Sequence, residues 1–292
     1  MKVGLHISDF TWAGGAPELA PRLAEIAQRA EQIGVDRISV MDHVWQIGHI
    51  GPPEHEMLEA YTALGWLAAK TERVKLLTVV TAVVYREPGL LAKAITTLDV
   101  LSGGRAILGL GAAWNEEESR GLGLFFPPLK ERFERLEEAL QIVKQMWSES
   151  EAAYEGKHYH LARTLNSPQP LSRPHPPILI GGSGEKKTLK FVAQYADACN
   201  INSREPAEAA RKLGVLRQHC ADVGRDYDQI EKTAQVRYDL GNNGENVNET
   251  IEGLHELAEA GFTVAHGSLN RVSEPGVLDL FAEKIIPAIE KF

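Results

Sequence analysis

The sequence has few cysteines and no excess of positive charge. Its two cysteines, Cys199 and Cys220, have neither metal-ligand spacing nor a disulfide framework, and they fit a reducing compartment. With 31 Lys and Arg against 40 Asp and Glu, the net charge is −9. This balance argues against nucleic acid as a partner, because phosphates would not be neutralised. A small anionic ligand in a locally positive pocket is still allowed.

Long apolar runs and several catalytic motifs are also missing. No run approaches the roughly 20 apolar residues of a membrane span. Residues 1–7 become polar too soon for a signal peptide. We therefore expect a cytoplasmic protein with no membrane partner. The chain has no Cys/His metal spacing and no Gly-x-Ser-x-Gly nucleophile elbow, so we predict no metal site and no serine-hydrolase chemistry.

Strand-like and helix-like segments alternate along nearly the whole chain. Strands are predicted at 3–7, 37–40, 74–84, 105–110, 178–180, 198–201, 232–238 and 263–266, and a helical pattern follows each. Such alternation implies a parallel sheet, and eight units favour a closed (β/α)8 TIM barrel. The length of 292 residues suits one barrel, and no change of composition marks a linker. We predict a single domain spanning residues 1–292.

Two connections are longer than usual, residues 42–56 and 148–176. Loops after the strands build the active site of a barrel of this type, so both are predicted to be insertions at the C-terminal face that cover a cofactor or substrate. A subunit contact is the alternative for 148–176.

A glycine-rich turn follows the strand at 178–180. It reads Gly181-Gly182-Ser183-Gly184 and leads into a helical pattern. Glycines allow backbone N–H groups to crowd together, and a helix start adds positive potential, so this turn can hold a phosphate. The alternative is a tight strand-to-helix turn with no ligand.

Other residues capable of chemistry stand just past predicted strand ends, where they would share one barrel mouth. Asp42, His43 and Trp45 follow the second strand, and His43 could exchange protons near neutral pH. Arg237 and His266 end the last two strands and are candidates for substrate contact.

The fourth strand ends in Gly109-Leu110-Gly111-Ala112-Ala113-Trp114-Asn115. A dinucleotide fingerprint would need Gly or Ala where Trp114 stands, so that interpretation is weak. We interpret residues 116–118, three glutamates, as the charged start of a helix.

Four of these motifs, taken in order, resemble the luciferase-like monooxygenase superfamily. They are Met41-Asp42-His43, the turn 109–114, the segment 131–138 and the turn 181–188. Within the superfamily the chain looks most like the branch that uses the deazaflavin coenzyme F420, and the likeness runs to about residue 202. It implies a (β/α)8 barrel whose mouth holds a flavin-type ring.

The resemblance also implies roles for individual residues. A non-proline cis peptide, expected between Thr78 and Val79, would support the back of the ring. His43 would be the ring-side histidine, and Asp42 would supply backbone contacts. The phosphate would lie on Gly181, Gly182, Ser183 and Gly184. The ring edge or tail would lie along Gly111, Ala112, Trp114 and Asn115.

The implied reaction is hydride transfer between F420 and an organic substrate, with His43 moving the accompanying proton. Sugar-phosphate dehydrogenases of this group place a glutamate in the fourth-strand turn, but here no carboxylate appears before Glu116. This departure argues against a glucose-6-phosphate-type activity. Aromatic loop residues such as Trp12 and Trp45 suggest a partly apolar substrate, and a homodimer is the family expectation. An FMN-dependent monooxygenase and a non-catalytic flavin-binding barrel are the alternatives.

Overall fold

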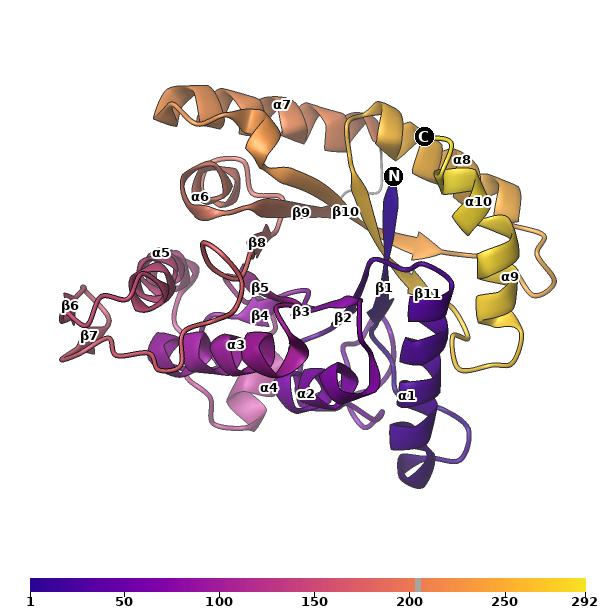
Figure 1. The fold of residues 1–292 in the computed structure, drawn as a ribbon, viewed down its shortest axis with the longest axis horizontal. Helices are drawn as coiled ribbons and strands as arrows, with labels where there is room; N and C mark the ends of the chain where they lie inside the picture. Colours follow the sequence, from indigo (N-terminus) through magenta and orange to yellow (C-terminus); the bar gives the residue numbers. More distant parts are fainter. Residues whose placement is uncertain (203–205) are drawn as a thin grey trace.

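A computed structural model describes residues 1–202 and 206–292, and in it the parallel strands form a closed barrel surrounded by helices (Figure 1). Neighbouring strands follow the order β3-β2-β1-β11-β10-β9-β8-β5, and β5 pairs back with β3 to close the sheet. The TIM-barrel prediction is confirmed. The barrel strands are β1 (Lys2–Ile7), β2 (Arg37–Val40), β3 (Lys75–Thr78), β4 (Thr81–Ala82), β5 (Ala106–Gly111), β8 (Ile178–Gly181), β9 (Ala198–Asn202), β10 (Glu231–Tyr238) and β11 (Val264–Leu269).

The helices follow the strands and shield their outer faces, as a parallel sheet requires. They are α1 (Ala16–Gln32), α2 (Ala60–Lys70), α3 (Pro88–Ser102), α4 (Glu116–Gly121), α5 (Leu129–Trp147), α6 (Thr188–Tyr195), α7 (Pro206–Val223), α8 (Val247–Glu259), α9 (Val277–Lys284) and α10 (Ile286–Ile289), with a short 3-10 turn, η1 (Tyr227–Gln229). No helix of the described ranges is long and apolar enough to cross a membrane.

Side chains alternate between the two faces of each strand. Val3, Leu5 and Ile7 of β1 belong to the large apolar core shared with the helices. A second, smaller cluster takes one residue from each of four other strands and fills half of the barrel interior: Leu77, Ile107, Leu179 and Ala198.

The other half of the interior is polar. Gly4 pairs with Arg37 on one side and with His266 on the other, so these side chains share the inward face. Arg37 is fully buried and forms ion pairs with Asp36 and Glu231, both at 2.6 Å, at the strands' N-terminal ends. One level nearer the mouth, His6 Nδ1 lies 2.9 Å from Ser39 Oγ.

Several predicted boundaries differ from the structure. The predicted strand 74–84 is two strands, β3 and β4, separated by Val79 and Val80. The last strand continues past His266 to Leu269. Residues 185–187 are a turn, and helix α6 begins at Thr188.

The two long connections lie in different places. The 42–56 loop follows a strand and reaches the mouth, where His43 and His49 line cavities. Segment 148–176 follows a helix instead. It carries a small hairpin, β6 (Tyr154–Glu155) with β7 (His160–Leu161), beside α5 at the edge of the molecule (Figure 1). Its Ser172 N–H donates to Asp99 of α3 at 2.8 Å. Of the described residues, none from 148–176 lines the mouth cavities, so the structure does not support the predicted cover by this segment. The role of 42–56 as a cover stays a prediction.

Candidate active site

A cavity of about 360 Å³ opens at the C-terminal ends of the strands. It brings together residues that are far apart in the chain, and most of the predicted cofactor site is among them. The predicted residues in its wall are Asp42, His43, Val79, Gly111, Ala112, Trp114, Asn115, Gly181 and Gly182. The other lining residues are Val80, Ala82, Tyr85, Ala113, Leu129, Phe133, Thr188, Asn200, Asn202 and Gln235.

The back wall of this cavity is the Val79–Val80 bulge between β3 and β4. The non-proline cis peptide joins Val79 to Val80, so the predicted position at Thr78–Val79 is wrong by one residue. Thr78 still belongs to β3, where it pairs with Val40, and its buried hydroxyl lies 2.6 Å from Thr81 Oγ1. The chain therefore leaves the regular strand one residue later than expected.

Two glycines make room for the bulge. A Cβ atom at Gly111 would lie 2.7 Å from Val80 Cγ2, and one at Gly181 would lie 2.7 Å from Val80 Cγ1. Such distances are shorter than real side-chain contacts, so neither strand could carry a larger residue here without displacing Val80. These glycines serve close packing around the bulge as well as access to the cavity.

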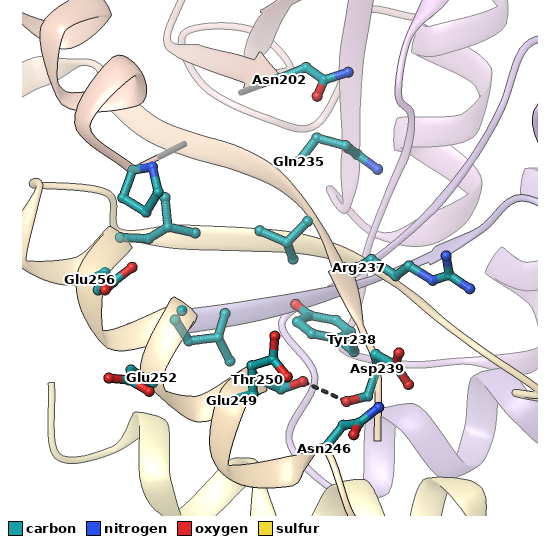
Figure 2. A pocket seen from close by; sticks show the side chains of 15 residues that line it. Asn202, Gln235, Arg237, Tyr238, Asp239, Asn246, Glu249, Thr250, Glu252 and Glu256 are labelled. Carbon is teal, nitrogen blue, oxygen red and sulfur yellow. Dashed lines mark hydrogen bonds between the residues drawn. The ribbon is translucent and has the colours of Figure 1, made fainter. Parts of the chain in front are cut away.

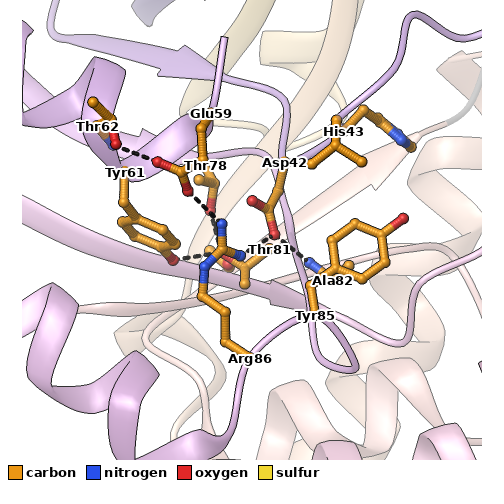
Figure 3. A network of polar contacts seen from close by, with 12 residues as sticks. Asp42, His43, Glu59, Tyr61, Thr62, Thr78, Thr81, Ala82, Tyr85 and Arg86 are labelled. Atoms are coloured by element: carbon orange, nitrogen blue, oxygen red, sulfur yellow. Dashed lines mark hydrogen bonds and ion pairs between the residues drawn. The ribbon is translucent and has the colours of Figure 1, made fainter. Parts of the chain in front are cut away.

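Asp42 contacts β4, the strand that follows the bulge, through Ala82, and it also contacts Arg86 (Figure 3). Its carboxylate is only 4% exposed and accepts hydrogen bonds from Ala82 N–H at 3.0 Å and from Arg86 at 2.7 Å. Burial raises the pKa of Asp42, although the Arg86 guanidinium opposes this effect. Arg86 also contacts Glu59 at 2.6 Å and lies over the ring of Tyr61. Asp42 thus fixes the strand that carries the bulge.

His43 is held by a carboxylate that the sequence analysis did not assign to the site. Its Nδ1 contacts Glu118 Oε1, and Glu118 is 0% exposed. The other oxygen, Oε2, accepts from the backbone N–H of Val44 at 2.8 Å and of Trp45 at 3.2 Å. Burial alone would raise the pKa of Glu118, but the hydrogen bonds and the imidazole lower it below its usual value. Glu118 is therefore an ionised acceptor, and His43 Nδ1 carries a hydrogen.

Glu118 lies on α4, a helix that begins after Asn115. Asn115 accepts from Glu117 N–H at 3.3 Å as the N-cap. The first turn has three glutamates, as predicted, but only the third turns inward; Glu116 pairs with Arg120 near the surface. The sequence signal that could have indicated Glu118 is its position: it lies in the first turn of a short helix that begins directly after a barrel strand, where one side chain in a turn faces inward.

The opposite end of the cavity is suited to an anion. Gly182 has φ +120°, and Thr188, the first residue of α6, lines the wall. Lys187 Nζ lies 5.3 Å from the ring of Phe133, which also lines the cavity. A helix start, a glycine turn and a lysine together favour phosphate. Ser183 and Gly184 lie outside the lining, and the Ser183 hydroxyl donates to Asn202 C=O at 2.8 Å.

The three predicted substrate residues do not lie together. Trp45 packs on α4, where a Cβ at Gly121 would lie 2.8 Å from its Cζ2. His266 is 0% exposed inside the barrel, and both of its ring nitrogens lack a partner within residues 1–202 and 206–292. It fails to reach the mouth because β11 continues for three more residues.

Arg237, the third predicted substrate residue, does reach the mouth and lines two further cavities on either side of β10. One, of about 640 Å³, has an acidic wall formed by α8 (Figure 2). In that view Arg237 extends away from Glu249, Glu252 and Glu256. Its guanidinium contacts Asn270 at 3.1 Å, on the side of the other cavity.

Comparisons with known proteins agree with this geometry. The profile of the luciferase-like monooxygenase family matches residues 1–275. An F420-dependent glucose-6-phosphate dehydrogenase from Kineococcus radiotolerans is 33% identical over 234 residues, which cover 77% of this chain and 66% of that protein. The chain thus spans slightly less than two thirds of this relative's length.

Two solved structures share the fold. An F420-dependent secondary alcohol dehydrogenase in complex with an F420-acetone adduct has a TM-score of 0.82 at 19% identity, covering 99% of this chain and 98% of its own. A long-chain alkane monooxygenase has a TM-score of 0.81 at 15% identity, covering 100% and 91%. With its barrel, its bulge and the family profile spanning residues 1–275, the chain belongs to the luciferase-like monooxygenase family.

Proposed function

We propose that this protein is an F420-dependent oxidoreductase that transfers a hydride between coenzyme F420 and an organic substrate. The observation that carries the proposal is one cavity that combines the Val79–Val80 bulge, the ion-paired His43 and the glycine turn at 181–182. The F420-dependent glucose-6-phosphate dehydrogenase among the relatives supports the choice of cofactor.

The residues of the cavity fit a planar ring with a phosphate-bearing tail. Val79 and Val80 offer an apolar surface for one ring face, and the missing side chains at Gly111 and Gly181 leave that surface open. Trp114, which is 60% exposed, is placed to cover the ring edge or tail. Thr188, at the start of α6, would hold the phosphate through its backbone N–H, with Lys187 adding positive charge. The N–H of Gly182 already donates to Asn200 C=O at 3.0 Å, so Gly182 would contribute room for the phosphate and no hydrogen bond. Ser183 and Gly184 would shape the turn but do not line the cavity.

F420, when bound, supplies a ring carbon that accepts or releases a hydride. The chain's own contribution is to orient the reactants and to move a proton. Because Glu118 holds the hydrogen on His43 Nδ1, the other nitrogen, Nε2, is left as the proton acceptor. As Nε2 takes a proton from a substrate hydroxyl, the charge of Glu118 stabilises the imidazolium that forms. In the reverse direction Nε2–H returns the proton.

The runner-up is an FMN-dependent monooxygenase. The same cavity offers a ring surface and a phosphate end, and the alkane monooxygenase shares the fold. A titration with F420 and, in parallel, with FMN, followed by fluorescence quenching, separates the two. Tighter binding of F420 supports the proposal. Tighter binding of FMN replaces it with the monooxygenase, and oxygen uptake becomes the next assay. Binding of neither overturns the proposal.

Variants show whether binding uses this cavity. We expect Gly181→Val to abolish binding because its side chain would meet Val80. The matched control is Gly214→Val in α7, where an added Cβ meets no atom within 4 Å. Turnover of any substrate would eliminate the third alternative, a non-catalytic flavin-binding barrel. The homodimer stays a prediction, to be measured by sedimentation velocity.

A further inference from the structure

A second cavity, of about 660 Å³, opens at the mouth beside the proposed cofactor cavity. It lies between the end of β1, helix α1 and the ends of β10 and β11. The 42–56 loop separates the two cavities: His49 lines the second, and its ring centroid lies 6.4 Å from that of Trp114, which lines the first. A molecule in the second cavity would therefore lie next to the proposed ring site.

The floor of this cavity is polar because three neighbouring strands present polar side chains at one level. Arg237 of β10 pairs in register with Ser268 of β11. Ser268 Oγ lies 3.3 Å from Ser8 Oγ, just past the end of β1. His6, two residues earlier on β1, also lines the cavity and is 6% exposed. His6, Arg237 and Ser268 belong to strands, and Ser8 directly follows one, so their positions are held firmly.

His6 is fixed as a neutral hydrogen-bonding group. Ser39 Oγ occupies its Nδ1 at 2.9 Å. Burial lowers the pKa of His6 to about 4, and the nearby His43 acts in the same direction. A neutral imidazole can donate to or accept from a hydroxyl or carbonyl group of a ligand.

The cavity also has two cationic side chains that form no ion pair. Within the described residues, neither Arg22 nor Arg237 forms an ion pair: Arg22 donates to Ser273 C=O at 2.9 Å and Arg237 to Asn270. The Arg22 Nε atom is buried and has no acceptor among these residues. The third arginine of the wall, Arg271, pairs with Glu274 at 3.2 Å.

The same wall has two acidic side chains, and neither contacts Arg22 or Arg237. Asp9 accepts from Thr11 N–H at 2.9 Å, and Glu274 pairs with Arg271. Trp12 and Ile50 add an apolar wall. Three arginines, Arg22, Arg237 and Arg271, face two carboxylates, Asp9 and Glu274, so the wall keeps one net positive charge. This charge, a neutral imidazole and an apolar wall define the ligand chemistry, because guanidinium groups favour carboxylate or phosphate.

We propose that this cavity binds the substrate, and that the substrate is a partly apolar molecule whose carboxylate or phosphate group is bound by Arg22 and Arg237 while a polar group other than the reacting hydroxyl faces His6. The assignment of this ligand as the substrate rests on the proposed function. The anion site itself stands on the residues of the cavity and can be measured separately.

The test is calorimetric titration of the F420-loaded protein with three probes that share a phenyl ring: mandelate, phenyl phosphate and benzyl alcohol. Mandelate carries a carboxylate and a hydroxyl, phenyl phosphate carries a phosphate, and benzyl alcohol is uncharged. We expect at least one anionic probe to bind ten times or more tightly than benzyl alcohol. Comparison of mandelate with phenyl phosphate then identifies which anion the cavity prefers.

Variants locate the site. Arg237→Gln and Arg22→Gln should each weaken binding of the preferred anion about tenfold or more, because each removes a charge-assisted hydrogen bond. Arg29→Gln is the matched control. It removes the same charge from α1, but Arg29 pairs with Asp279 at 2.6 Å outside this cavity and should leave binding unchanged. Arg237 is exposed, so its replacement should not affect folding.

The proposal is overturned if no anionic probe binds better than benzyl alcohol, or if Arg237→Gln binds the anion as tightly as the original protein. Failure of the proposed function gives a different result. Titration with F420 then causes no fluorescence quenching, while binding of the anion to the protein without F420 still depends on Arg237. The two ideas can therefore fail independently.

Discussion

Replacement of Glu118 by glutamine should reverse the tautomer of His43. In the native protein the Glu118 carboxylate can only accept, so His43 Nδ1 carries the hydrogen and Nε2 is free to take a proton. A glutamine can keep its carbonyl on the Val44 and Trp45 N–H groups and turn its NH₂ toward His43. Nδ1 must then accept, and the hydrogen moves to Nε2. The base that the proposed reaction needs is lost.

The expected size of the effect follows from these contacts. General base catalysis contributes about 10² to 10⁴ in rate, so kcat should fall by a factor in this range. The fold should change little because both N–H groups keep an acceptor. Glu118→Ala provides the comparison, since it leaves two half-buried N–H groups without their acceptor. It should lower the free energy of unfolding by about 1 kcal/mol for each, the low end of the cost of an unpaired buried group.

The tautomer can be measured without a substrate. Two-bond ¹H–¹⁵N correlation spectra of ¹⁵N-histidine-labelled protein distinguish a protonated Nδ1 from a protonated Nε2. His43 is assigned by comparison with His43→Asn. If Glu118→Gln leaves the His43 pattern unchanged, or if turnover persists at the native rate despite the change of tautomer, the role given to Glu118 is wrong.

Three further predictions use other parts of the site. Gly181→Ala should weaken F420 binding at least tenfold in a fluorescence titration, because its Cβ would lie 2.7 Å from Val80. Arg86→Leu should lower the free energy of unfolding by about 3 kcal/mol in urea titrations, because it leaves the Asp42 carboxylate buried without its cation. Lowering the pH from 7 to 5 should reduce the free energy of unfolding by about 2 kcal/mol, because the pKa of His6 is lowered to about 4 in the folded protein.

The sign of the His6 effect follows from linkage. In the unfolded chain His6 binds a proton near pH 6.5, whereas in the folded chain it stays neutral down to about pH 4. The contribution of His6 to the free energy of unfolding is therefore complete above pH 6.5 and decreases as the pH is lowered from 6.5 to 4. His6→Gln should remove this part of the pH dependence, and an unchanged slope would contradict the assignment. For the glycine prediction, Gly214→Ala in α7 is the control. For Arg86→Leu, a decrease in the free energy of unfolding of less than about 1 kcal/mol would show that the buried charge of Asp42 does not depend on Arg86 for its stabilisation.

The barrel could be predicted from the sequence because its signals are local. Each strand is a short apolar run, each helix has its own periodicity, and the observed β2 has the predicted bounds, Arg37–Val40. The errors occur where a local signal is ambiguous. The residues after His266 include glycine and serine, which gave no strand signal, yet β11 continues through them because Ser268 and Leu269 pair with β10. Pairing with a neighbouring strand outweighs local propensity there.

The difference between local signals and contacts between elements also explains which site residues could be predicted. His43, Trp114 and Gly181 were predictable because they stand at strand ends, and the topology alone brings strand ends together. The orientation of a side chain on a six-residue helix is not set by topology. Periodicity cannot be read over so short a segment, and three consecutive glutamates conceal which one faces inward. Glu118 becomes visible only when α4 is packed against the 42–56 loop.

The fourth-strand turn, residues 111–114, has no carboxylate. The absence of a carboxylate there argued against one substrate type, but it does not leave His43 without an acidic partner, because Glu118 reaches the imidazole from α4. A carboxylate at 112 would stand inside the cofactor cavity, whereas Glu118 lies behind His43 and is fully buried. Ala112 adds no charge to the wall of this cavity, and the arginines proposed to select a substrate, Arg22 and Arg237, line the second cavity instead. The absence of a carboxylate from this turn therefore bears on the proposed substrate, and the proposed proton transfer by His43 does not depend on it.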